Sequence, residues 1–363
     1  MKTIQLLKPE LESTTERLQV YQWPEKSEAA LSSSEQTESA GDAVQRDAIK
    51  VVTSNDRSIP RPVCFAWEGI RTASENPAYD LLISTDNEFE NLLVIKDIAE
   101  PCRNVLNLHI GTRYFWKVIA RNRDSVLAAS SVWTFTTHPS TPRWLHVPGI
   151  TNVRDMGGWR LSGNQRIRQG LIYRSSEMNN IINITREGKQ YLIEELRIRT
   201  DLDLRGCNQA LKEAEETKAV LDQSIVKWIN ISIQSYGNIV TNEYREKYRQ
   251  IFKVFSDPSA YPIIFHCRAG CDRGATVAFL LHALLGLDRD ALIRDFELSS
   301  LSLWGKRSHL SDSFQILLST LRQFGDEKDD VRRQVENYLH SIGVTAEEIA
   351  SIRTYLTEET DSR

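Results

Sequence analysis

The stretch Pro262–Leu285, PIIFHCRAGCDRGATVAFLLHALL, decides how this chain is expected to fold. Its first part, Ile263–Phe265, is a short apolar run after a proline, which predicts a buried strand. Its last part, Thr276–Leu285, combines apolar residues with good helix formers, and Gly286 follows where a left-handed helix C-cap is expected. A strand, a tight loop and a helix in this order turn backbone N–H groups and a helix N-terminus toward one point. Such a point binds anions, and phosphate above all.

The loop between the predicted strand and helix contains a cysteine and an arginine separated by five residues, Cys267 and Arg273. A thiolate is a strong nucleophile, and a helix N-terminus and a fixed cation stabilise its charge. Arginine holds two phosphate oxygens at once with its planar fork, which a lysine cannot do. We therefore expect Cys267 to be a nucleophile and Arg273 a phosphate clamp. The rest of the loop is expected to line the phosphate site, namely Arg268, Ala269, Gly270, Cys271 and Gly274.

His266–Arg273 resembles the HCxxGxDR signature loop of the cysteine-dependent tyrosine phosphatase family, in particular of its bacterial tyrosine/lipid phosphatase branch. Four other stretches resemble motifs of this branch in the right order. Gly149–Gly158 is similar to its GxxNFRDLGG motif, Ile172–Ser175 to its YRS strand, Asp201–Arg205 to its DLR strand and Asp295–Ser299 to its DYxLS helix. The resemblance spans about residues 145–360. It agrees with the alternating strands and helices of this region, which predict an α/β domain with a central sheet flanked by helices.

Two loop positions depart from the family pattern. Members usually carry threonine or serine directly after the arginine, where this chain has Gly274, and lysine or alanine after the glycine, where it has Cys271. In relatives the hydroxyl is expected to assist the release of the cysteine sulfur in the second chemical step. Cys271 either fills a position for a small residue or forms a reversible disulfide with Cys267. Cysteines so close in one loop seldom meet disulfide geometry, which favours the first alternative.

A phosphoryl transfer also needs a carboxylic acid that protonates the leaving oxygen. The resemblance places this acid, or an equivalent carboxylate, at Asp272. Asp203, at the end of a predicted strand, is the competing candidate. Asp155 is the third, with a turn-forming role as its alternative.

The resemblance further gathers three arginines around the pocket, each with a structural ion pair as the alternative: Arg154, Arg174 and Arg205. His266 precedes the cysteine and could be a general base. We expect it instead to hold the loop through hydrogen bonds, which is also the role that the resemblance implies.

Residues 60–137 show a different pattern, with short alternating segments separated by turn residues. Strands are expected at 63–67, 79–84, 92–95, 105–110, 114–120 and 131–136, and several short strands in so few residues predict a β-sandwich. Four of the segments resemble strands of a fibronectin type III module: 65–67, 82–85, 111–118 and 133–137. Trp67, Trp116 and Trp133 are expected in its core, the alternative being a ligand-stacking platform.

The chain is thus expected to be multidomain. Residues 1–57 form a polar extension, in which the alternating stretch 18–23 could add an edge strand. Residues 58–138 form the fibronectin type III-like β-sandwich, and residues 139–363 form the tyrosine-phosphatase-like domain. The linker is expected at 138–142, HPSTP.

Composition excludes several classes of protein. A hydrophobic content of 40% with 26% charged residues is typical of a soluble globular protein, and a net charge of −4 disfavours nucleic-acid binding. No stretch approaches the length of a membrane span. The five cysteines are widely spaced and give neither a disulfide framework nor a zinc site. The first fourteen residues lack the apolar core of a signal peptide, so we expect a cytoplasmic protein, or a secreted one whose leader has been removed.

The function expected from these features is that of a cysteine-dependent phosphomonoesterase with a phosphocysteine intermediate, which needs no metal or organic cofactor. Phosphorylated proteins, phospholipids and inositol phosphates all fit such a loop as substrates, and the β-sandwich offers a surface to a protein partner. One alternative is a phosphate-binding or scaffolding protein with impaired turnover, because of Gly274. Another is arsenate reduction, for which Cys271 is the only support.

Overall fold

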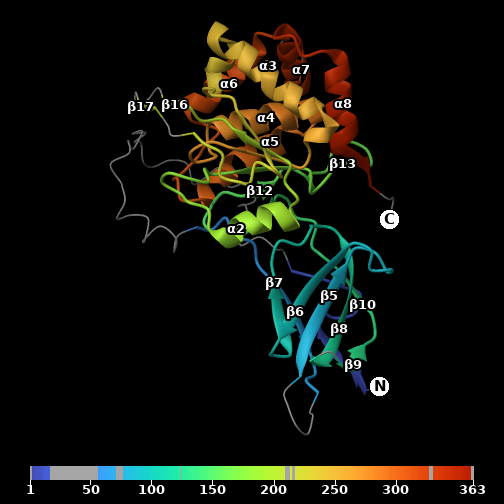
Figure 1. Ribbon diagram of the computed structural model, residues 1–363. Helices are drawn as coiled ribbons and strands as arrows, with labels where there is room; N and C mark the ends of the chain where they lie inside the picture. The colour runs from blue at the N-terminus through green and yellow to red at the C-terminus, as the bar shows by residue number, and fades with distance from the viewer. Residues whose placement is uncertain are drawn as a thin grey trace, which may run out of the picture. The chain divides into compact units, whose positions relative to one another are not determined.

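The computed structural model describes residues 2–16, 56–70, 77–123, 125–208, 213–214, 217–326 and 330–360. The described residues fall into two compact units (Figure 1). Residues 2–16 and 60–143 belong to the first unit, and residues 56–59 and 144–360 belong to the second. The stretch 18–23, which could add an edge strand, lies outside the described residues. Among the helices that the structure describes, none has the length and apolar character needed to cross a membrane.

The first unit consists of two sheets whose buried side chains meet in one hydrophobic cluster. The larger sheet is built around β8 (Arg113–Asn122), which pairs antiparallel with three strands: β5 (Ala78–Ser84), β9 (Ser125–Ser130) and β10 (Trp133–Thr136). Strand β6 (Leu92–Ile98) extends this sheet beyond β5, while β4 (Val63–Trp67) and β7 (Cys102–Val105) pair in the smaller one. Trp67 and Trp116 are buried in the cluster and Trp133 packs against it, which confirms the expected core role.

Residues 2–14, which we expected in a polar extension, pair with both sheets of the first unit. Strand β1 (Lys2–Ile4) lies parallel to β9, β2 (Leu6–Lys8) lies antiparallel to β4, and β3 (Ser13–Thr14) lies parallel to β10. Each strand has only two or three residues, too few to show alternation in the sequence. The strand expected at 105–110 is instead β7, which ends at Val105, and β9 was not expected.

The second unit is built on a sheet with the strand order β11-β12-β14-β19-β15-β18. The bounds of its strands are β11 (Arg143–Trp144), β12 (Arg154–Asp155), β14 (Ile172–Ser175), β19 (Ile263–His266), β15 (Thr200–Asp203) and β18 (Lys227–Asn230). The last four in this order are parallel to one another. Their carboxyl ends therefore meet at one edge of the sheet, and β19 carries the Cys267 loop to the middle of that edge. A separate pair, β13 (Gln165–Ile167) and β20 (Thr357–Glu359), is antiparallel, as are the two short strands β16 (Cys207–Asn208) and β17 (Glu213–Ala214).

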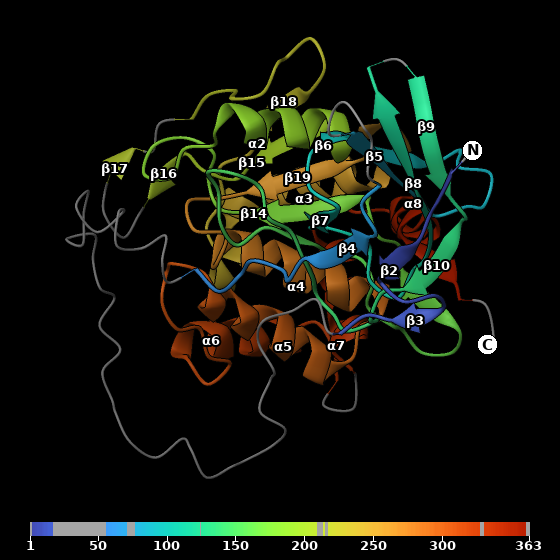
Figure 2. The same ribbon diagram turned by 90° about the horizontal axis from the view of Figure 1, so that it is seen from below.

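Helices cover both faces of this sheet (Figures 1 and 2). Side chains of β19 alternate, so that Ile263 and Phe265 lie in one hydrophobic cluster and Ile264 in another. The first cluster includes the buried faces of six helices: α3 (Asn242–Ser256), α4 (Arg273–Leu285), α5 (Arg289–Leu298), α6 (Asp312–Arg322), α7 (Val331–Ser341) and α8 (Ala346–Leu356). The second cluster includes residues of the π-helical turn η2 (Tyr191–Glu195), which directly follows the short helix α2 (Arg186–Gln190).

The predicted strand–loop–helix is present. The helix begins at Arg273, three residues before the apolar segment 276–285, and all thirteen of its residues are buried. Gly286 has a φ of 93° in the left-handed region, which confirms the predicted C-cap.

Candidate active site

The loop from Cys267 to Asp272 closes around the cysteine sulfur. Cys267 is only 2% exposed, and its Sγ accepts a hydrogen bond from the backbone N–H of Gly270 at 3.2 Å. Gly270 has a φ of 71°, and a Cβ at this position would lie 2.5 Å from the carbonyl oxygen of Ser175. Only glycine therefore allows the loop to approach β14 this closely.

The carbonyl groups of Arg268–Gly270 point away from the sulfur, into the surrounding scaffold. They accept hydrogen bonds from the backbone N–H of Glu177, from Nδ2 of Asn152 and from Nη2 of Arg174, at 3.0, 3.1 and 2.7 Å. Because a trans peptide directs its N–H opposite to its carbonyl, the amides of residues 269–271 face the inside of the loop. The scaffold thus fixes a ring of donors that suits a phosphate group.

Arg154 and Arg174 lie in a buried ion-pair cluster behind the loop. Arg154 Nε and Arg174 Nη1 donate to the two carboxylate oxygens of Asp295 at 2.9 and 2.8 Å, and both guanidinium groups donate to Ser299 Oγ. Burial opposes ionisation of Asp295, but the two arginines outweigh it and hold the pKa of this carboxyl well below its usual value. Burial and the neighbouring Arg154 lower the pKa of Arg174 to about 10. These contacts are the structural ion pair that was the alternative for both arginines.

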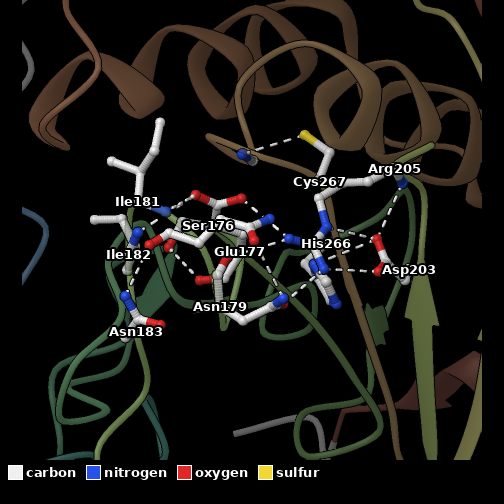
Figure 3. Close-up of polar contacts among 12 residues, drawn as sticks. Ser176, Glu177, Asn179, Ile181, Ile182, Asn183, Asp203, Arg205, His266 and Cys267 are labelled. Atoms are coloured by element: carbon white, nitrogen blue, oxygen red, sulfur yellow. Dashed lines mark hydrogen bonds and ion pairs between the residues drawn. The ribbon is translucent and has the colours of Figure 1, made fainter. Parts of the chain in front are cut away.

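Arg205 is the centre of a second buried network, drawn in Figure 3. Its guanidinium donates to Asp203 Oδ2 at 2.8 Å, to Glu177 Oε2 at 3.0 Å and to Asn179 Oδ1 at 2.8 Å. Burial raises the pKa of Glu177, although Arg205 works against this. The network ties the segment after β14, which carries Glu177 and Asn179, to the end of β15.

His266, the residue before the nucleophile, belongs to the same network. Its Nε2 lies 3.1 Å from Asp201 Oδ1, and its Nδ1 lies 3.8 Å from Asp203 Oδ1. Burial opposes protonation, but Asp201 and Asp203 raise the pKa of His266 above its usual value. Burial also opposes ionisation of Asp203, but His266 and Arg205 lower its pKa. His266 is thus held between two carboxylates, in the loop-supporting position that the sequence suggested.

The three candidate acids have different surroundings. Asp203 is fully buried and both of its oxygens accept hydrogen bonds from Arg205. Asp155 is also buried, and it accepts from the backbone N–H groups of Gly157 and Gly170, which is the turn-forming alternative. The side chain of Asp272 is 41% exposed. Of these three carboxyl groups, that of Asp272 is therefore the one open to a substrate.

Two side chains that the sequence did not single out hold Asp272. The hydroxyl of Tyr236 donates to Oδ1 at 2.5 Å, and Nη2 of Arg307 donates to Oδ2 at 3.2 Å. Tyr236 begins the 3-10 helix η3 (Tyr236–Val240) after β18, and its pKa is raised by burial and by Asp272, so its hydroxyl keeps the proton that it donates. Arg307 follows η5 (Ser299–Leu301), and its backbone N–H and carbonyl both bond to Ser300 Oγ.

Gly274 leaves space beside the nucleophile. A Cβ built at this position would lie 3.8 Å from Cys267 Sγ, an ordinary van der Waals contact. The nearby hydroxyl of Thr276 is directed elsewhere, since it donates to the Asp272 carbonyl at 3.0 Å and accepts from the Tyr236 N–H at 3.1 Å. The first side-chain atom of a threonine at position 274 would therefore lie next to the sulfur without a clash.

Cys271 fills a small buried space at the back of the loop. Its Sγ donates to the carbonyl of Ala269 at 3.3 Å and accepts from Asn152 Nδ2 at 3.5 Å. Burial raises the pKa of the Cys271 thiol to about 11, so it stays protonated near neutral pH. Its surroundings are those of an inert core residue, the first of the two alternatives.

Comparisons with known proteins match the part of the chain that contains this loop. The model of the tyrosine phosphatase family matches residues 145–358. The Cupriavidus necator protein named "Putative tyrosine-protein phosphatase" is 25% identical over 170 residues, which are 40% of this chain and 59% of that protein. The chain therefore spans less than two thirds of the length of this relative.

Two solved structures show weaker likeness. The core catalytic domain of the PP-IP phosphatase SIW14 from S. cerevisiae has 14% identity and a TM-score of 0.30, covering 48% of this chain and 93% of that one. The fibronectin type-III domain of human fibronectin type III domain containing protein 3 has 26% identity and a TM-score of 0.20, covering 22% of this chain and 75% of that one. At such low TM-scores neither likeness carries an argument about this chain.

Proposed function

Because the chain belongs to the tyrosine phosphatase family, we propose that it is a phosphomonoesterase that uses Cys267 as its nucleophile. The observation that carries the proposal is the loop around the sulfur, with inward amides and Arg273 at the start of a buried helix. In the first step the thiolate attacks phosphorus, the phosphorus–oxygen ester bond breaks, and the alcohol leaves with a proton. In the second step water attacks phosphorus, the sulfur–phosphorus bond breaks, and inorganic phosphate leaves.

Each loop group has a role in this reaction. The amides of residues 269–271 and the guanidinium of Arg273 stabilise the three equatorial oxygens as the phosphoryl group becomes planar. Asp272 gives its proton to the leaving oxygen, a role supported by its exposure. Tyr236 and Arg307 donate to its two oxygens, which orients the carboxyl group and favours its charged form, so it takes up this proton when the phosphate dianion binds beside it. Arg154, Arg205 and Asp203 support the loop from behind and do not touch the substrate.

Trapping the intermediate tests the proposal directly. The enzyme is mixed with p-nitrophenyl phosphate, quenched in acid within milliseconds and digested for mass spectrometry. We expect a phosphate on the peptide that contains Cys267, together with release of p-nitrophenol. Neither product would appear if the protein only bound phosphate, and this result would reject the proposal.

The substrate is proposed to be a phosphate monoester of the kinds suggested by the sequence, in a protein, a phospholipid or an inositol phosphate. A phosphotyrosine peptide, a phosphoinositide in vesicles and an inositol phosphate, assayed side by side at equal concentration, separate the three classes. The ratio of their kcat/KM values, rather than turnover of any one of them, assigns the class.

Phosphate binding with slow turnover is the second candidate function, and Gly274 is the observation that favours it. The hydroxyl usual in the family is missing, and Thr276 does not replace it. A hydrogen bond to a charged group contributes about 1.5–3 kcal/mol, so its loss slows sulfur departure by roughly 10- to 150-fold. In this case phosphocysteine accumulates because its breakdown limits turnover.

Gly274→Thr is therefore expected to raise kcat by up to about tenfold and to shrink the burst of p-nitrophenol seen in rapid-quench traces. Formation of the phosphoenzyme should change little, because sulfur loses charge in that step. Gly69→Thr is the matched control, because Gly69 lies in the first unit, has no positive φ, and an added Cβ there makes only ordinary van der Waals contacts. A wild type without a burst, and a threonine variant with unchanged kcat, would show that the missing hydroxyl is immaterial.

Tyr236→Phe removes one of the two donors that orient Asp272. We expect kcat/KM for phenyl phosphate, a poor leaving group, to fall by about 3- to 10-fold, and that for p-nitrophenyl phosphate to fall much less. Tyr261→Phe is the control, since its hydroxyl donates to the Phe255 carbonyl and does not touch Asp272. Equal losses for both substrates would contradict a role for Tyr236 in acid catalysis.

We also propose that the first unit is a fibronectin type III-like module with a protein partner. Two sheets around one core support this, and so does the hydroxyl of Tyr114, which accepts a hydrogen bond from the backbone N–H of His109 at 2.8 Å. A tyrosine that bonds back to the chain a few residues upstream is a hallmark of sandwiches of the immunoglobulin type.

A further inference from the structure

A short turn outside the residues matched by the family model contacts the support of the catalytic loop. Asp56, Arg57 and Ser58 lie in the chain between the two segments of the first unit, but they belong to the compact unit that contains Cys267. Asp56 Oδ1 accepts hydrogen bonds from the backbone N–H and the hydroxyl of Ser58, at 2.9 and 2.5 Å, which makes an Asp-x-Ser turn.

Side-chain and backbone hydrogen bonds fasten this turn to the segment before β12. Asp56 Oδ2 accepts from the hydroxyl of Thr151, and Ser58 Oγ accepts from the backbone N–H of Asn152 at 3.2 Å. The N–H of Arg57 donates to the carbonyl of Leu301 at 2.9 Å. Ser58 is 2% exposed, so water does not replace its hydroxyl as the partner of Asn152.

Asn152 is the residue that transmits this contact to the loop. It is fully buried and has a φ of 57°, a left-handed conformation that a residue other than glycine keeps only when its neighbours fix it. Its Oδ1 accepts from Arg154 Nη1 at 2.6 Å, and its Nδ2 donates to the carbonyl of Ala269 at 3.1 Å. The backbone of Asn152 is thus fixed by Ser58, while its side chain is hydrogen-bonded to the catalytic loop.

The Ala269 carbonyl, which accepts the hydrogen bond from Asn152, belongs to the same peptide group as the N–H that contacts the nucleophile. The carbonyl of Ala269 and the N–H of Gly270 are in one planar peptide group, and that N–H donates to Cys267 Sγ at 3.2 Å. A change in the position of Asn152 therefore tilts the amide that faces the sulfur. Three hydrogen bonds, through Asn152 and the peptide between Ala269 and Gly270, therefore connect Ser58 to the sulfur of Cys267.

We propose that Ser58, held by Asp56, is a positioning residue for the catalytic loop, acting through Asn152 on the peptide between Ala269 and Gly270. The inference rests on the proposed phosphatase function for its kinetic readout. It extends the functional unit to a turn that precedes residue 145, the start of the family match.

The chain contains two matched controls. Asp222–Ser224 and Asp257–Ser259 are Asp-x-Ser turns with the same two local hydrogen bonds, of 2.9 Å from the serine N–H and 2.7 Å from its hydroxyl. Both serines are exposed, and among the described residues their hydrogen bonds stay within their own turns. Replacing either serine by alanine removes the same local bond from the hydroxyl to the aspartate as Ser58→Ala does, without touching Asn152.

The test compares full-length Ser58→Ala with Ser224→Ala and Ser259→Ala. Three quantities are measured for each variant: kcat/KM for p-nitrophenyl phosphate, the affinity for orthovanadate, and Tm. Orthovanadate resembles the planar phosphoryl group and reports the loop donors without turnover. We expect Ser58→Ala to lower kcat/KM and vanadate affinity by about 3- to 20-fold each, because the amide that faces the sulfur is displaced. The two controls stay within about twofold of wild type.

Two further variants keep the test decisive. Ser58→Thr retains the hydroxyl and is expected to recover most of both values. Asp56→Asn, which weakens the acceptor but keeps the shape, should give a smaller loss in the same direction, and it replaces Ser58→Ala if that variant does not fold.

The outcomes separate this inference from the proposed function. The inference is overturned if Ser58→Ala has the same kcat/KM and vanadate affinity as the two control variants. It is also overturned if Tm falls while the kinetics stay unchanged, because this result shows a merely structural role. A wild type without turnover rejects the proposed function. In that case weaker vanadate binding by Ser58→Ala still supports the positioning role, and unchanged binding overturns it.

Discussion

Cys267→Ser is expected to lower turnover of p-nitrophenyl phosphate by at least about 10,000-fold. A serine hydroxyl is a poor nucleophile at neutral pH unless a base takes its proton. The adjacent His266 does not supply this base, because its two ring nitrogens lie against Asp201 Oδ1 and Asp203 Oδ1, at 3.1 and 3.8 Å, and not against residue 267. Steady-state assays at high enzyme concentration measure the residual rate.

Two other cysteine variants serve as controls for this prediction. Cys64→Ser changes an exposed thiol of the first unit, and Cys271→Ser changes a buried one behind the loop. The first should keep wild-type turnover, and the second should keep the phosphocysteine intermediate on Cys267. The serine variant at position 267 should still bind orthovanadate, since the amides and Arg273 remain. Substantial turnover by Cys267→Ser would place the nucleophile elsewhere and reject the mechanism.

Arg273→Lys is expected to lower kcat/KM by about 100- to 1,000-fold while the fold stays intact. Lysine keeps the charge but contacts the phosphoryl oxygens at one point instead of two. The resulting loss of stabilisation is larger in the transition state, where the phosphoryl group is planar. The stem of residue 273 is fixed at the start of a fully buried helix, so lysine cannot shift to compensate. Michaelis–Menten kinetics, together with Tm, separate this loss from unfolding.

Arg353→Lys is the matched control, because Arg353 also makes a two-point contact, with Glu336, at 3.1 and 2.7 Å. It joins helices α8 and α7 away from the loop, and its lysine variant should retain wild-type kcat/KM. Near wild-type kinetics of Arg273→Lys would mean that this residue is not the phosphate clamp.

The strand–loop–helix could be predicted because its signals are local. An apolar run, a glycine and a second apolar run stand next to one another in the sequence, and Gly286 marks the end of the helix. The apolar signal of the helix begins at Thr276, three residues after the helix itself begins at Arg273, because Arg273 is charged and Gly274 is a poor helix former. The phosphate-binding residues Cys267 and Arg273 could also be recognised from the sequence, because they lie close together in one loop.

Partners from other strands could not be predicted in this way. Tyr236 and Arg307 each contribute a single side chain from a segment without periodicity, and only the parallel arrangement of β18 and β19 brings the first of them near Asp272. Arg154 and Arg174 were recognisable as charged motif residues, but their shared partner Asp295 is more than a hundred residues away in the sequence. Charge alone did not show whether these arginines face the substrate or the scaffold.

The contacts of Asp56 and Ser58 affect where the chain can be divided into its two units, and the order in which contacts form during synthesis. Along the chain the two units alternate: residues 2–16 belong to the first, 56–59 to the second, 60–143 to the first and 144–360 to the second. No single cleavage point therefore yields two complete halves. During synthesis, Ser58 leaves the ribosome before Asn152. The hydrogen bond between these two residues can therefore form only after all of residues 60–143 have been translated. An expression fragment that starts at residue 145 would contain every motif of the family and still lack the turn that holds Asn152.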